Sequence, residues 1–460
     1  MTSGLLREFE EDALGMTGEQ LYRFAQDLYP ICRSITGAGI RETLRRIGER
    51  IPLKISDVPT GTSVFDWTVP KEWNVRDAYI KDCRGCRITD FLQNNLSVVN
   101  YSIPVHTMLS LEELRPHLHT LPDHPDWIPY RTSYYREDWG FCLAHRQLQA
   151  LQPGIYEVCI ESSLEDGRLS YGECFLPGRS SDEILISCHI CHPSLANDNL
   201  SGLAVATALA ERLSRRDLRY SYRFLFIPGT IGAITWLARN MERIGRIRHG
   251  VVLTGIGDEG GFHYKKSRRG NAWIDRTVAH VLKHCGESAE ILEFSPYGYD
   301  ERQYCSPGFN LPVGCLMRSV WGTYPEYHTS ADNLNFIRPP QLGNSFQVCL
   351  AIADVLENNR RYYNLNPFCE PQLGKRDLYR TRGGEAPGNE ITARLWVLNL
   401  SDGDHTLLDI AERSGLPFHT IADAACVLWE KGLLREIAEE TSGTVQDSRR
   451  AADSGRVSTN

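Results

Sequence analysis

The stretch CHICHPSLANDNLSG, residues 188–202, decides the fold because it joins a predicted strand to a predicted helix and carries polar side chains at the junction. The apolar run Glu183–Ser187 before it predicts a buried strand, and Gly202–Leu213 after it predicts a helix. Two further strands are predicted at Tyr222–Ile227 and Gly250–Thr254, with a helix between them. Strands that alternate with helices favour an α/β fold with a largely parallel mixed sheet flanked by helices.

Candidate metal ligands occur where these strands end. His189 and Asp198 lie in the loop after the first strand, Asp258 follows the strand that ends at Thr254, and His328 comes later. Ligand-binding residues of open α/β sheets lie beyond the carboxyl ends of the strands, and imidazole and carboxylate groups are zinc ligands. We therefore expect these four side chains to converge on Zn2+, as one or two ions. His192 is a candidate additional ligand because His-x-x-His places two imidazoles within one turn of loop.

Composition changes divide the chain into regions. Residues 1–63 and 177–370 form the predicted α/β domain, and residues 64–176 have the short alternating runs of an inserted β-rich domain. Three short helices predict a winged-helix-like module at residues 388–438. The polar tail at residues 439–460 is predicted to be disordered.

Charge and hydropathy narrow the class of partner. The formal net charge of -8 provides no basic footprint for nucleic acid, and residues 419–425 of the predicted recognition helix contain no Lys or Arg. We expect the winged-helix module to serve interaction or dimerisation, so a homo-oligomer is a candidate state. No stretch approaches the roughly 18 apolar residues that span a bilayer. The 14 dispersed cysteines suit reduced thiols, so we expect a cytoplasmic protein with a small-molecule or short-peptide substrate.

The order of the candidate ligands resembles that of the co-catalytic zinc aminopeptidases. That family has a His after a strand, an Asp-Asn-x-x-Gly helix start, a Glu pair, an Asp and a final His, and residues 198–202 match the second element. The sequence is more similar to a subfamily of bacterial aminopeptidase-like proteins associated with polysaccharide or natural-product biosynthesis. The stretches that carry this similarity are 189–202, 264–269, 300–305 and 327–333. The resemblance covers nearly the whole chain and implies an inserted β domain and a C-terminal winged helix.

The resemblance also implies roles for the candidate ligands. It places His189 and Asp258 on one metal, His328 on a second, and Asp198 between them. Such a pair polarises a scissile carbonyl and activates water, with a Glu as general base beside a second Glu that ligates metal. The segment Ile227–Gly232 departs from this pattern, because Gly229 stands where the subfamily has a Glu.

Gly229 leaves three alternatives open. Glu259, Glu301 or Tyr327 substitutes as the catalytic group; the site holds one metal and performs different chemistry; or catalysis is lost. The function that we expect is a metal-dependent aminopeptidase-like amidohydrolase acting on a small peptide or amide-bearing metabolite. The alternatives are a non-hydrolytic biosynthetic enzyme that reuses the metal pocket and an inactive binding or regulatory protein that uses the winged helix.

Three further polar residues are candidates for substrate binding. Arg268 belongs to the basic run Lys265–Arg269, where a guanidinium can pair with a substrate carboxylate. Asp300 and Arg302 follow the turn at residues 296–299, where they could bind a free amine or position a ligand.

Overall fold

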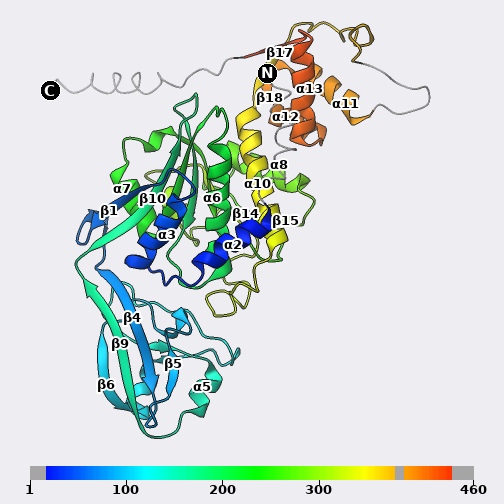
Figure 1. The fold of residues 1–460 in the computed structure, drawn as a ribbon. Helices are drawn as coiled ribbons and strands as arrows, with labels where there is room; N and C mark the ends of the chain where they lie inside the picture. Colours follow the sequence, from blue (N-terminus) through cyan, green and yellow to red (C-terminus); the bar gives the residue numbers. More distant parts are fainter. Residues whose placement is uncertain (1–16, 379–387, 438–460) are drawn as a thin grey trace, which may run out of the picture. The chain divides into compact units, whose positions relative to one another are not determined.

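The computed structural model describes residues 17–378 and 388–437 (Figure 1). The chain separates into two compact units, with the boundary between Glu357 and Asn358. The tail at residues 439–460, for which disorder is predicted, lies outside the described residues.

The first unit is built on one eight-stranded mixed sheet. Its central strands are parallel: β12 pairs with β11, β11 with β13, and β13 with β16. The outer pairs β1–β10, β10–β12 and β14–β16 are antiparallel. In sheet order the strands are β1 (Lys54–Pro59), β10 (Arg168–Leu176), β12 (Ser221–Ile227), β11 (Glu183–His189), β13 (Ile247–Leu253), β16 (Val313–Met317), β14 (Phe262–Lys265) and β15 (Ala289–Leu292). The predicted α/β fold with a largely parallel mixed sheet is confirmed.

The central strands are buried along their whole length. Every residue of β11 and β12 is buried, which is the pattern of parallel strands covered on both faces. Burial of Arg223 in β12 is balanced by two glutamates: its Nε lies 2.6 Å from Glu183 of β11, and its Nη1 lies 2.8 Å from Glu173 of β10. These ion pairs link side chains of three neighbouring strands.

Helices cover the sheet. Helix α6 (Gly202–Leu213) is buried along nearly its whole length and packs against β11, β12 and β13, because its charged side chains, Glu211 and Arg212, are confined to the last turn. Helix α2 (Gly18–Leu28) packs on α6 and begins at a capping box made by Thr17. The other long helices of this unit are α3 (Ala38–Gly48), α7 (Ile231–Arg239), α8 (Trp273–His284) and α10 (Pro339–Asn358).

Residues 72–165 contain a second, antiparallel sheet with the order β5-β4-β9-β6. Figure 1 shows β4 and β9 side by side, as their pairing requires. Its strands are β4 (Glu72–Lys81), β5 (Arg87–Asp90), β6 (Val105–Ser110) and β9 (Ile155–Glu165). The chain then returns through β10 to the large sheet.

The second unit has the three helices and small sheet of a winged helix. Helices α11 (Asn389–Leu400), α12 (Leu407–Ser414) and α13 (Phe418–Glu430) pack on one another, and β17 (Arg361–Asn364) lies between β18 (Asp402–Thr406) and β19 (Leu434–Glu436). Thr406 begins α12 with a capping box, and Gly415 ends it in the left-handed region with φ 72°. Within the described ranges, no helix is both long enough and apolar enough to cross a lipid bilayer.

Candidate metal centre

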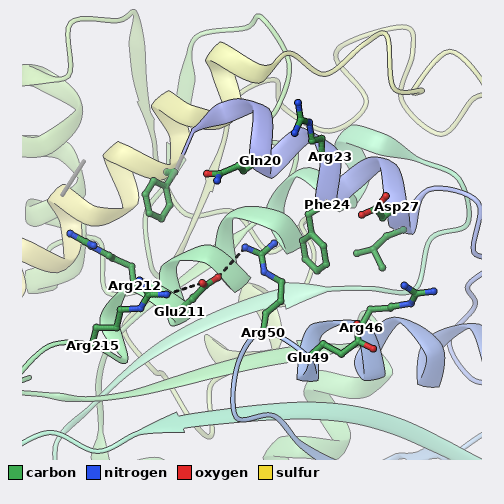
Figure 2. A pocket seen from close by; sticks show the side chains of 12 residues that line it. Gln20, Arg23, Phe24, Asp27, Arg46, Glu49, Arg50, Glu211, Arg212 and Arg215 are labelled. Carbon is green, nitrogen blue, oxygen red and sulfur yellow. Dashed lines mark hydrogen bonds and ion pairs between the residues drawn. The ribbon is translucent and has the colours of Figure 1, made fainter. Parts of the chain in front are cut away.

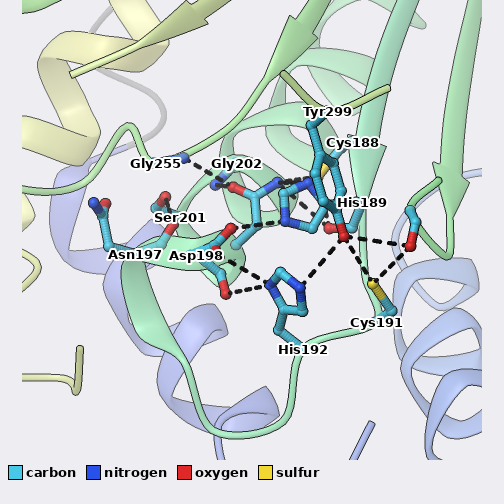
Figure 3. A network of polar contacts seen from close by, with 12 residues as sticks. Cys188, His189, Cys191, His192, Asn197, Asp198, Ser201, Gly202, Gly255 and Tyr299 are labelled. Carbon is cyan, nitrogen blue, oxygen red and sulfur yellow. Dashed lines mark hydrogen bonds and ion pairs between the residues drawn. The ribbon is translucent and has the colours of Figure 1, made fainter. Parts of the chain in front are cut away.

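Two histidines and one aspartate meet at the end of β11. His189 is the last residue of that strand, and its Nε2 lies 2.8 Å from Oδ1 of Asp198. His192 Nδ1 lies 3.2 Å from Oδ2 of the same carboxylate. One ligand atom from each of the three residues lies within 4.8 Å of the other two, and all three side chains are buried. Figure 3 shows both rings directed toward Asp198.

A third histidine reaches the same carboxylate from a distant segment. His328 Nε2 lies 3.0 Å from Oδ2 of Asp198, although 130 residues separate them in the chain. We call His189, His192, Asp198 and His328 the histidine cluster. The predicted convergence of His189, Asp198 and His328 is thus present in the fold.

Burial and mutual contacts shift the pKa values of His189, His328 and Asp198. Desolvation lowers the pKa of His189 to about 4 and also lowers the pKa of His328. Burial alone raises the pKa of Asp198, but its contacts with the three imidazoles outweigh this effect and hold the pKa well below the usual value. Neutral imidazoles and an ionised carboxylate are the forms that bind metal ions, so the donor set fits zinc.

Hydrogen bonds to the backbone hold Asp198 in place. Asp332 is fully buried and accepts the N–H groups of Asn197 at 2.6 Å and Asp198 at 2.9 Å. The amide of Asn199 donates to the carbonyl of Leu253 at 2.9 Å and accepts from the N–H groups of Gly255 and Gly202. This explains the Asp-Asn-x-x-Gly pattern: the Asp faces the cluster, and the Asn ties the helix start to the end of β13.

Asp258 lies beside the histidine cluster with its carboxylate engaged elsewhere. It accepts hydrogen bonds from Asn197 Nδ2, the Gly260 N–H and Ser319 Oγ, each at 2.7 Å. Asn197 precedes Asp198, so the two aspartates are linked through one residue. The role of Asp258 as a ligand stays a prediction.

Tyr299 occupies the space beside Gly229. A Cβ atom at position 229 would lie 2.0 Å from Cε1 of the Tyr299 ring and 2.7 Å from its hydroxyl oxygen. The ring lies over His189, with centroids 4.2 Å apart. Its hydroxyl lies 3.3 Å from His192 Nε2 and 3.3 Å from the Gly229 carbonyl oxygen (Figure 3). The position that lacks the expected glutamate is therefore filled by a phenol from another loop.

The predicted residues of the 300–302 segment differ in their surroundings. Glu301 is fully buried, lies 2.5 Å from Lys265 Nζ and accepts the N–H of Tyr299. Asp300 is fully buried, and neither of its carboxylate oxygens has a hydrogen-bond partner in the described part of the chain. Burial raises its pKa well above the usual value. Arg302 is exposed.

Of the remaining candidates, Tyr327 is at the site and two others lie on the surface. The Tyr327 ring stacks on His328 with centroids 4.0 Å apart. Glu259 is exposed and lies 3.6 Å from Arg338, and Arg268 is exposed and donates to Asn310.

A segment of the region 64–176, at Pro129 and Tyr130, contacts the histidine cluster. Pro129 forms an antiparallel bridge with Thr329, and the Tyr130 N–H donates to the His328 carbonyl at 2.8 Å. The Tyr130 ring packs edge-on against His192 and His328, with centroid distances of 5.3 and 5.1 Å. The second sheet's region thereby covers one side of the histidine cluster.

A separate cavity of about 500 Å³ lies between α2, α3 and α6 (Figure 2). Arginines line much of it, and two of them, Arg50 and Arg215, form ion pairs with Glu211 at 2.9 and 3.0 Å. No member of the histidine cluster lines this cavity. The histidine cluster and this cavity are therefore different places in the fold.

Known proteins resemble this chain over most of its length. A Clostridium acetobutylicum protein, named as a polysaccharide biosynthesis protein with an aminopeptidase-like domain, is 51% identical over 421 residues, which cover 91% of this chain and 96% of that protein. A crystal structure from the same organism, described as that of a peptidase, has a TM-score of 0.89 and 48% identity, and covers 95% of this chain and 100% of that one. A zinc aminopeptidase from Bacillus subtilis has a TM-score of 0.53 at 12% identity, over 74% of this chain and 95% of that one, which shows the shared fold.

Family models agree with the division of the chain. A model described as a domain of unknown function, DUF4910, matches residues 22–359, and one described as a winged helix-turn-helix matches residues 360–436. The predicted resemblance to aminopeptidase-like proteins with a C-terminal winged helix is confirmed. The chain belongs to the DUF4910 family, whose fold here is that of the zinc aminopeptidases.

Proposed function

We propose that this protein is a metal-dependent aminopeptidase-like amidohydrolase that acts on a small peptide or an amide-bearing metabolite in a biosynthetic pathway. The observation that carries the proposal is the meeting of three imidazoles on one buried carboxylate at the end of β11. The name of the Clostridium acetobutylicum relative supports the biosynthetic setting.

Zinc is the proposed metal because the residues present suit it. His189 and Asp198 would hold the ion, with His328 and Asp258 as further proposed ligands of one or two ions. When bound, zinc acts as a Lewis acid toward a carbonyl group. Without a cation, the Nε2–H groups of His189 and His328 can donate to the Asp198 carboxylate at 2.8 and 3.0 Å, and a cation would take the place of those protons.

The protein's own side chains shape the space in front of the cluster. Tyr327 stacks on His328, and Tyr130 covers His192 and His328, so two phenols bound the site and limit access of water. We propose Tyr327 as the catalytic hydrogen-bond donor among the three candidates. Glu301 is committed to Lys265, and Glu259 faces solvent.

The proposal for substrate binding rests on Asp300. Asp300 is buried without a hydrogen-bond partner among the described residues, and burial raises its pKa, so a substrate ammonium group could pair with it by stabilising the ionised form of the carboxyl group. Arg302 and Arg268 are proposed to meet the polar end of a substrate from the exposed side.

The test combines metal analysis with an amidase assay. Purified protein should contain zinc and cleave aminoacyl amides, and His189→Ala should lose both properties. The matched control is His106→Ala, because His106 is exposed on β6 and belongs to no part of the cluster. A well-folded, metal-free protein, or hydrolysis that His189→Ala leaves intact, would contradict the proposal.

The second candidate function is a non-hydrolytic biosynthetic reaction in the same pocket. The observation that favours it is Gly229, because a phenol replaces the carboxylate that would accept a proton. Zinc-loaded protein without amidase activity, but with His189-dependent conversion of an amide-bearing metabolite without loss of its amide bond, would establish it.

The winged-helix unit is proposed as an interaction module and not as a nucleic-acid reader. Helix α13 contains no Lys or Arg to meet phosphates. A salt-dependent mobility shift of duplex DNA by the full chain would overturn this reading, whereas a concentration-dependent mass in solution without DNA binding would support a homo-oligomer.

A further inference from the structure

His192 is held on both sides of its ring. Its Nδ1 faces the cluster, 3.2 Å from Oδ2 of Asp198 and 3.1 Å from the Asp198 carbonyl oxygen. Its Nε2 faces the other way, 3.3 Å from the Tyr299 hydroxyl. The ring is buried, with 6% of the residue's surface exposed. Both ring nitrogens therefore have defined neighbours, and solvent does not choose the tautomer.

The Tyr299 hydroxyl can complete a directed chain of hydrogen bonds. It lies 3.3 Å from the Gly229 carbonyl, which can only accept. With the Tyr299 O–H donated to that carbonyl, the hydroxyl oxygen is free to accept from His192 Nε2–H. If Nδ1 binds a cation, the ring proton is on Nε2, where the Tyr299 oxygen can accept it, and Nδ1 is the nitrogen that faces Asp198. A hydrogen bond on the remote nitrogen is the usual means by which a protein prepares a histidine to ligate metal.

His192 Nδ1 is the ring nitrogen directed at the carboxylate of Asp198. It lies 3.2 Å from Oδ2, and without a cation its N–H can donate to Oδ2 and to the Asp198 carbonyl oxygen. A cation at this place would take the position of that proton. His189, His192 and Asp198 each offer one atom to such a cation, since their three atoms lie within 4.8 Å of one another.

Glycine at position 229 is what permits this arrangement. Any side chain there begins with a Cβ that would lie 2.0 Å from Cε1 and 2.6 Å from Cζ of Tyr299. The ring and a side chain at 229 exclude each other. The Tyr299 ring can therefore occupy this place only because residue 229 has no side chain.

We propose that Tyr299 is a positioning residue that makes His192 a metal ligand, so that His189, His192 and Asp198 hold a single zinc ion. This rests on the proposed metal dependence of the site. It differs from the two-ion scheme that the zinc aminopeptidases imply, in which His192 has no role. Three protein ligands leave one position open, as in catalytic zinc sites. His328 then orients Asp198 through Oδ2 instead of binding a second ion.

The test measures zinc binding, not activity. Metal-free full-length protein is titrated with zinc in competition with a chromophoric chelator. Wild type should bind one equivalent. Tyr299→Phe should also bind one equivalent but about 10- to 100-fold more weakly, the usual loss when a hydrogen bond behind a metal-bound histidine is removed. His192→Ala should weaken binding further.

Tyr297→Phe is the matched control. It removes the same hydroxyl group two positions away, from a side chain that is 72% exposed, and should leave affinity unchanged. Tyr299→Phe keeps the ring that packs on His189, so the metal-free variant should still unfold cooperatively, with a melting temperature lowered only by the loss of its hydrogen bond to the Gly229 carbonyl. Cobalt supplies a second readout: the visible absorption bands of the Co2+ form should change in Tyr299→Phe and not in Tyr297→Phe.

The outcomes separate this inference from the proposed function. Two equivalents in wild type, or unchanged affinity in Tyr299→Phe or His192→Ala, overturn the inference even where the protein hydrolyses amides. One tightly bound ion that depends on Tyr299, in a protein without amidase activity, supports the inference and removes the proposed function. Absence of zinc binding overturns both.

Discussion

Gly229→Ala offers a direct measure of how tightly Tyr299 fills the site. The added Cβ would lie 2.0 Å from Cε1 of Tyr299, whereas carbon atoms in contact lie about 3.5–4.0 Å apart. The ring must move by more than 1 Å, on the order of the difference between those distances. Overpacking of this kind costs about 1–3 kcal/mol. We expect Gly229→Ala to lower the free energy of unfolding of the first unit by that amount.

Urea unfolding of the metal-free protein, followed by circular dichroism, measures the effect. Gly245→Ala is the control, because a Cβ at position 245 meets nothing within 4 Å. Tyr299→Ser removes the ring, so in the double variant Gly229→Ala should cost much less. The coupling should fall within the roughly 0.5–3 kcal/mol seen for residues in contact. A harmless Gly229→Ala, or costs that simply add in the double variant, would refute the reasoning.

Three other predictions concern regions away from Tyr299. Arg223→Met leaves the buried carboxylate of Glu183 unpaired and should cost about 3–5 kcal/mol in urea unfolding. Burial lowers the pKa of His249 to about 3, so the unfolded chain binds one more proton than the folded chain as pH falls below about 6.5. As the pH is lowered from about 6.5 to about 3, this group should lower the free energy of unfolding by up to ~1.4 kcal/mol per pH unit. His249→Gln should make the free energy of unfolding less dependent on pH in this range. Thr406→Ala removes the cap of α12 and should destabilise the second unit by about 1 kcal/mol in a thermal melt, while Arg413→Ala at the other end of that helix changes much less.

The gathering of His189, Asp198 and His328 was predictable because parallel strands place their carboxyl ends at one edge of a sheet. The runs that predicted β11, β12 and β13 are long and apolar, and burial on both faces leaves such strands little choice of partner. The Asp-Asn-x-x-Gly pattern is local, so its geometry follows from its sequence.

Tyr299 was not predictable in the same way. It lies in a loop without periodicity, and 70 residues separate it from Gly229, so only the folded chain shows that the two compete for space. The unusual glycine was the available signal, and it called for a neighbour large enough to fill the gap. Gly229→Glu alone therefore does not test whether the missing glutamate limits hydrolysis, because the new side chain collides with the Tyr299 ring.

Asp332 and Tyr130 were missed for a related reason. Asp332 accepts hydrogen bonds from backbone N–H groups 134 and 135 residues away in the chain. A sequence motif does not show which distant backbone groups a carboxylate will bind. Tyr130 comes from the region 64–176, whose short strands predicted a β-rich insertion. The pattern of those strands does not indicate which residues of the insertion contact the histidine cluster.

The Pro129–Thr329 bridge makes the insertion part of the wall of the histidine cluster. Excising residues 72–165 would remove the Tyr130 ring that packs against His192 and His328 and would open that side of the cluster to bulk solvent. Under the proposed function, relatives that differ in residues 72–165 would differ in the space beside the cluster while keeping every residue of β11.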